Sequence, residues 1–80
     1  MTYVYLLRSI AFPDTWYTGM TGDLKVRLRD HNAGRSIHTA DRRPWELVAY
    51  LAFKDEHRAI EFEKYLKSGS GRAFARKHFR

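Results

Sequence analysis

The first stretch of the chain with strand character is rich in apolar side chains. The run Tyr3–Leu7, YVYLL, is rich in β-forming residues, and its side chains alternate between two faces, so Tyr5 shares a face with Leu7. A second stretch with strand character begins at Trp16, after a segment in which Pro13-Asp14 signals a turn. The pattern therefore predicts a hairpin of two strands.

After the second strand, the apolar positions change to a helical period. Gly19 and Gly22 bracket a predicted turn, where glycine allows a positive φ or the close approach of a ligand. Asp23 follows as a helix N-cap, and apolar residues recur at helical spacing from Leu24 onward. We expect this helix to end at Asn32–Gly34, with the glycine just past its last turn.

One face of this predicted helix combines apolar and polar side chains. Leu24, Leu28 and His31 fall on that face, and Arg27 lies at its edge. The arginine and histidine are four residues apart and therefore neighbours. Tyr17, at the end of the second strand, would face them across the glycine turn. This arrangement suits a phosphate, although the alternative for a strand tyrosine is an ordinary core ring.

The second half of the chain predicts one strand and two helices. Trp45–Phe53, WELVAYLAF, is the longest apolar run, and we expect a strand covered on much of both faces that carries the core. Asp55 begins a second helix, Ser68–Gly71 interrupts it, and Arg72–Arg80 forms a basic terminal helix. The expected fold is α/β (α+β), a single domain over residues 1–80 with a three-stranded, mostly antiparallel sheet flanked by helices.

The acidic residues of the second helix differ in their position around its axis. Its apolar stripe includes Ala59 and Leu66, and Glu61 points away from that stripe. Glu63 lies at the edge of the stripe, and Glu56 occupies the same edge seven residues earlier. A carboxylate at such an edge is sheltered yet reachable, which suits a metal ligand, and the geometry leaves both residues as candidates.

Composition narrows the possible partners. The net charge is +6, which favours a polyanion such as nucleic acid, with simple solubility as the alternative. The absence of cysteine excludes disulfides and cysteine zinc sites, and the four histidines lack ligand spacing. No apolar run approaches the roughly 18 residues of a membrane span, and no signal peptide is visible. We expect no membrane partner and a cytoplasmic location.

A polar, basic segment without periodicity, RSIHTADRR, separates the first helix from the third strand. We expect a loop here, in which Arg35, Arg42 and Arg43 contact phosphates; the alternative is a solvated connector. Lys67 and Arg72, near the end of the second helix, are further candidates for nucleic-acid binding.

The order of these features resembles the GIY-YIG nucleases, and most closely the small single-domain members of that superfamily. Tyr3-Val4-Tyr5 stands in place of GIY, and Tyr17-Thr18-Gly19 in place of YIG; a helix arginine, a histidine and a later glutamate follow. Two departures are the changed residues of both triplets and the missing asparagine after the glutamate, since Asn32 precedes it.

The resemblance implies a metal-dependent endonuclease that hydrolyses phosphodiester bonds, with DNA the favoured substrate and RNA the alternative. It selects Glu63 as the ligand of one divalent cation, Mg²⁺ or Mn²⁺. Arg27 would bind a phosphate oxygen. Tyr5 would act as general base because nearby cations favour its phenolate, and Tyr17 would bind the water or the phosphate. His31 would assist proton transfer or orient Tyr5.

Other functions remain open from the sequence. Without the resemblance, Glu63 would be expected to form an i,i+4 ion pair with Lys67. The leading alternative to an enzyme is a nucleic-acid-binding module of the same fold without catalysis. A protein-interaction domain rests only on the 15% aromatic content. Because a domain this small has little area for reading a base sequence, we expect a branch, flap or single-strand preference.

Overall fold

Three antiparallel strands form one sheet in the order β2-β1-β3. In the computed structural model, which describes all residues from 1 to 80, these strands are β1 (Thr2–Ser9), β2 (Trp16–Thr21) and β3 (Trp45–Phe53). The first strand of the sequence, β1, is the central strand of the sheet. The predicted hairpin pairs β1 with β2, and β3 pairs with the other edge of β1. The predicted three-stranded antiparallel sheet is confirmed.

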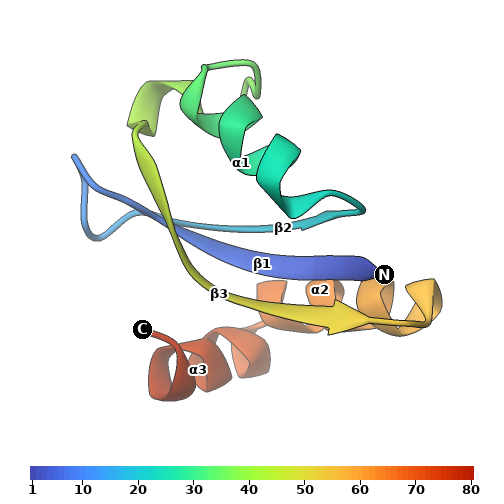
Figure 1. Cartoon of the computed structure of the whole chain (residues 1–80). Helices are drawn as coiled ribbons and strands as arrows, with labels where there is room; N and C mark the ends of the chain where they lie inside the picture. Colours follow the sequence, from blue (N-terminus) through green and yellow to red (C-terminus); the bar gives the residue numbers. More distant parts are fainter.

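Helices cover both faces of the sheet (Figure 1). Helix α1 (Leu24–Asn32) lies on one face, whereas α2 (Glu56–Lys67) and α3 (Gly69–His78) lie on the other. A single 3₁₀ turn, η1 (Ala40–Arg42), occupies part of the segment that was expected to be a loop. None of the helices has the length and apolar character that a membrane span requires.

The core is centred on β1. Val4 and Leu6 point toward α2 and α3 and are completely buried, while Tyr5 and Leu7 point toward α1 and are buried equally well. This alternation follows from the period of two along a strand that has neighbours on both sides.

The prediction that the third strand carries the core is wrong. Along β3 only Trp45 is buried, and exposed residues alternate with partly buried ones up to Phe53. An apolar run is consistent with a fully covered strand, but β3 lies at the edge of the sheet. Helix α1 does not cover its far half, so Tyr50 remains 53% exposed.

Short side chains define where the helices begin. The Asp23 carboxylate accepts a hydrogen bond from Val26 N–H at 3.1 Å, as expected of an N-cap. Helix α3 begins at Gly69 rather than at the predicted Arg72, because Ser68 Oγ accepts from the N–H of Gly71 at 3.2 Å and caps the helix. The glycine–serine segment therefore starts a helix instead of forming a linker.

Candidate active site

Two tyrosines lie side by side on the face of the sheet that α1 covers. Tyr5 on β1 stands opposite Gly19 on β2, and the ring centroids of Tyr5 and Tyr17 are 6.3 Å apart. A Cβ atom on Gly19 would lie 2.4 Å from the Tyr5 hydroxyl oxygen and 2.9 Å from a Tyr17 ring carbon. Gly19 thus lets the Tyr5 ring cross β2. The glycine lies within a strand rather than in the predicted turn, and the group that approaches it is a tyrosine.

A chain of buried hydrogen bonds fixes the Tyr5 hydroxyl. His31, which is 0% exposed, contacts the hydroxyl through Nε2 at 2.8 Å and Thr39 Oγ1 through Nδ1 at 2.7 Å. The Thr39 hydroxyl donates to the carbonyl oxygen of Ser36 at 3.4 Å, so its oxygen accepts from Nδ1–H. We assign the ring proton to Nδ1 on this basis, which leaves Nε2 to accept the hydrogen bond of Tyr5.

The electrostatic surroundings keep this histidine neutral. Burial lowers the pKa of His31, and the positive charge of Arg27 lowers it further, whereas Asp30 opposes both with a weaker effect. The neutral imidazole can accept a hydrogen bond from the phenol, whereas burial and the Arg27 charge make it a weaker proton acceptor than a free histidine.

Thr39 is a member of this chain that the sequence did not reveal. It is 0% exposed, and its carbonyl oxygen accepts a hydrogen bond from Trp45 Nε1 at 2.9 Å. Threonine in a polar, aperiodic segment gives no signal of burial. Only the fold, which brings the segment before η1 over His31, gives Thr39 a role.

Arg27 faces both phenols from the edge of α1, as predicted. Burial alone would lower the pKa of Arg27, but its interactions with the Tyr5 and Tyr17 hydroxyls outweigh burial and raise that pKa. Its Nη2 also lies 3.4 Å from Ser36 Oγ. The guanidinium is thus a positive charge beside the two hydroxyl groups.

Tyr5 is less acidic than sequence reasoning suggested. Burial raises the pKa of Tyr5, and the charges of Tyr17 and Glu63 raise it further. Arg27 lowers this pKa, but its effect is smaller than the combined effect of the others. Only 1% of the residue is exposed. The expectation that neighbouring cations make Tyr5 a phenolate is therefore not met in the protein alone.

Glu63 belongs to α2, in the helix layer on the face of the sheet opposite α1. Helix α2 packs against β1 and β2, and the carboxylate of Glu63 is close enough to affect the pKa of Tyr5. Its side chain is 19% exposed, and Lys67 Nζ lies 2.9 Å from one of its oxygens. The i,i+4 ion pair that was the alternative to a metal site is therefore present.

The surroundings of Glu63 suit a hard divalent cation bound through oxygen, such as Mg²⁺ or Mn²⁺. No group of three or more His, Cys, Asp or Glu side chains is placed to hold a metal ion, so a cation at Glu63 would have fewer than three such ligands. Mg²⁺ is commonly bound through one or two carboxylates, with waters and substrate phosphates completing its shell. One sheltered carboxylate meets that requirement, and its ion-pair partner is Lys67.

The five predicted nucleic-acid-binding residues fall into two groups. Lys67 and Arg72 line a groove that also includes Tyr17. The three loop arginines already have partners within the chain, through an ion pair, a cation–π contact and van der Waals packing. These partners are Asp30 for Arg35 (2.8 Å), the Phe12 ring for Arg42 (4.3 Å to its centroid) and the backbone of Gly34 for Arg43.

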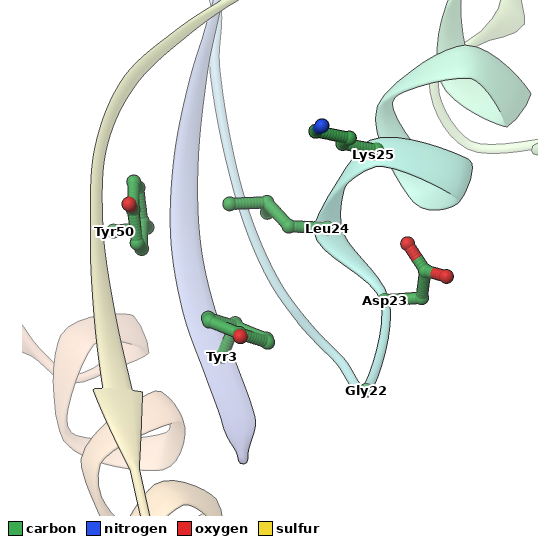
Figure 2. Close-up of a pocket in the computed structure, with 6 residues that line it drawn as sticks. All are labelled: Tyr3, Gly22, Asp23, Leu24, Lys25 and Tyr50. Atoms are coloured by element: carbon green, nitrogen blue, oxygen red, sulfur yellow. The ribbon is translucent and has the colours of Figure 1, made fainter.

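A hollow of about 420 Å³ lies elsewhere on the sheet (Figure 2). Figure 2 shows Tyr3 and Tyr50 from two strands facing Leu24 and Lys25 from α1. Lys25 projects from the side of α1 opposite Arg27, because the two residues are about 200° apart around the helix. The one acid of the hollow, Asp23, caps α1 through its side chain.

Comparison with known proteins agrees with the geometry. The sequence profile of the GIY-YIG catalytic domain matches residues 1–77. The UPF0213 protein of Lacticaseibacillus paracasei is 38% identical over 66 residues, which cover 81% of this chain and 72% of that protein. The UPF0213 protein BH0048 of Halalkalibacterium halodurans is 37% identical over 71 residues, covering 88% and 73%.

A solved structure shows the same fold. The solution NMR structure of the UPF0213 protein BH0048 from Bacillus halodurans aligns with a TM-score of 0.57 at 35% identity, over 95% of this chain and 81% of that one. The resemblance seen in the sequence is thus confirmed over nearly the whole chain, and this protein belongs to the GIY-YIG family.

Proposed function

We propose that this protein is a metal-dependent endonuclease that hydrolyses phosphodiester bonds in DNA. The observation that carries the proposal is the buried chain from Tyr5 through His31 to Thr39, with Arg27 facing the same hydroxyl. A tyrosine that only fills the core does not need a histidine and an arginine at its hydroxyl. A phenol held against a neutral imidazole and an arginine is typical of a site that moves a proton beside a phosphate.

The hydrogen-bond chain offers a route for the proton of an attacking water. Tyr5 accepts that proton on its oxygen while its own proton passes to Nε2 of His31, 2.8 Å away. The route avoids a free phenolate, which the raised pKa of Tyr5 disfavours. The Nδ1 contact with Thr39 holds the imidazole in the tautomer that this transfer requires.

The other groups bind the phosphate and its charge. Tyr17 is partly exposed, so its hydroxyl would bind a phosphate oxygen or hold the water whose proton Tyr5 takes. Arg27 meets the negative charge that develops on the phosphate in the transition state. A divalent cation held by Glu63 would supply further charge neutralisation and assist the leaving oxygen.

Substitution of Arg27 by lysine tests this proposal. Lysine keeps the positive charge and loses the planar fork, so we expect nearly unchanged DNA binding. Cleavage under single-turnover conditions should slow by roughly 10²–10³-fold, the usual effect of losing one preorganised donor. Arg29→Lys is the matched control, because Arg29 is exposed on another side of α1. Equal cleavage by Arg27→Lys and wild type would exclude this role.

A second candidate function rests on the ion pair at Glu63. Lys67 holds the proposed metal ligand at 2.9 Å, an arrangement that also suits a nucleic-acid-binding module without catalysis. If wild-type protein binds branched and single-stranded DNA but cuts none of it with Mg²⁺ or Mn²⁺, the binding module replaces the enzyme.

A further inference from the structure

A positively charged groove follows the outer edge of β2 and reaches the proposed active site. It measures about 300 Å³, and no acidic side chain lines it. Its walls come from the start of β2, the end of α2, and both ends of the α3 region. The lining residues are Trp16, Tyr17, Thr18, Leu66, Lys67, Arg72 and Arg80. Tyr17 belongs to the active site and Lys67 pairs with Glu63, so the groove is continuous with the site.

Trp16 gives this groove an aromatic wall. It is partly exposed, whereas the other tryptophan, Trp45, is 4% exposed and donates its indole N–H to Thr39 O. The guanidinium carbon of Arg80 lies 4.7 Å from the Trp16 ring centroid, and that of Arg8 lies 5.7 Å from it. Trp16 thus combines a reachable ring with two adjacent cations.

Helix α3 adds a stripe of like charges that nothing in the helix neutralises. Arg72 and Arg76 are four residues apart, Arg80 follows at the same spacing, and α3 has no acidic residue. Like charges at this spacing destabilise a helix. Burial, together with the charges of Arg76 and Arg72, lowers the pKa of Arg80, as expected where cations are crowded. A polyanion bound along this stripe would remove the repulsion.

We propose that the groove binds a single-stranded segment of nucleic acid, with one base stacked on Trp16 and the adjoining phosphates on Lys67 and Arg72. Inside a duplex both faces of a base are covered by the neighbouring base pairs, whereas a single strand can offer a face for stacking, and a cationic groove with an aromatic wall is the usual construction of single-strand sites. Binding of a duplex through its phosphates would use the cationic side chains of the groove but would not use the Trp16 ring. The base takes the place of the Arg80 guanidinium on the indole ring.

This assignment deepens the proposed function and rests on it, because the strand held at Trp16 is the one whose phosphate continues to Tyr17. The substrate is therefore DNA with an unpaired segment next to the scissile bond. The stacking site itself is measurable without cleavage, so the two proposals fail separately.

The test uses a labelled dT₁₂ strand and a 12-bp duplex, with affinity measured by fluorescence anisotropy. Loss of one stacked base lowers affinity by about 5–150-fold. We expect Trp16→Ala to weaken binding of dT₁₂ within that range and to leave duplex binding nearly unchanged. Trp16→Phe keeps a ring and should retain most of the affinity. Thermal unfolding of each variant, followed by circular dichroism, shows that it is folded at the assay temperature.

Intrinsic fluorescence adds a readout that a structural role would not affect. Addition of dT₁₂ should quench the wild-type emission, and Trp16→Phe, in which only the buried Trp45 remains, should lose that response. Arg72→Gln should weaken dT₁₂ binding, whereas Arg29→Gln, an exposed arginine on α1, should not. Unchanged dT₁₂ affinity in Trp16→Ala, or full quenching in Trp16→Phe, would overturn the inference. Equal losses for dT₁₂ and duplex in Trp16→Ala would replace it with a general backbone contact.

Discussion

Gly19→Ala is expected to destabilise the protein by pushing Tyr5 out of its position over β2. The added Cβ would lie 2.4 Å from the Tyr5 hydroxyl oxygen and 2.5 Å from its ring carbon Cζ. Tyr5 cannot yield easily, because it is 1% exposed and hydrogen-bonded to His31. Overpacking costs about 1–3 kcal/mol, and loss of the hydrogen bond adds about 1 kcal/mol. We predict a decrease of about 2–4 kcal/mol in the free energy of unfolding.

Urea unfolding followed by circular dichroism measures this decrease. Gly22→Ala is the matched control, since a Cβ at Gly22 meets no atom within 4 Å and should change stability by no more than about 0.5 kcal/mol. At a temperature where both variants are folded, Gly19→Ala should also cleave more slowly than Gly22→Ala. If Gly19→Ala is as stable as Gly22→Ala, the account of why a glycine stands opposite Tyr5 is wrong.

Three further predictions concern pH, salt and the end of α1. Burial lowers the pKa of His31 from 6.5 in the folded state. The unfolded chain therefore takes up the proton first, and the free energy of unfolding should fall as pH decreases below about 6.5. Urea titrations should show this dependence in wild type and in His57→Gln but not in His31→Gln. Affinity for single-stranded DNA should fall steeply with salt, and Arg72→Gln should reduce the slope of log K against log salt by about 0.7, whereas Arg29→Gln, an exposed arginine on α1, should not. Asn32→Ala removes two hydrogen bonds to the backbone of Trp45, at 2.6 and 3.1 Å, and should lower the free energy of unfolding by about 1–3 kcal/mol.

The sheet and the helices could be read from the sequence because each rests on a local pattern. The alternation in β1 correctly separated Tyr5 from Leu6, and the helical period placed His31 toward the sheet with Arg27 at its edge. Edge position is not a local property. The apolar run of β3 therefore suggested a core strand, although its outer side has no neighbour.

The hydrogen-bond network could not be predicted for a related reason. Thr39 and Ser36 lie in an aperiodic segment, and their burial depends on how that segment folds back over His31. The acidity of Tyr5 was misjudged because counting nearby cations omits burial, which is the larger effect here. The sole asparagine, Asn32, accepts a hydrogen bond from the backbone N–H of Trp45, which links the end of α1 to the first residue of β3.

The central claim is tested most directly by cleavage of a branched DNA substrate with an unpaired arm, with and without Mg²⁺, by wild type, Glu63→Gln and Glu61→Gln. Glu63→Gln keeps the shape of the side chain and removes the charge that would hold the cation. Glu61→Gln changes an exposed residue on another side of α2. We predict that wild type and Glu61→Gln cut only when Mg²⁺ is present, and that Glu63→Gln is slower by orders of magnitude. Equal cutting by Glu63→Gln and wild type would contradict the account.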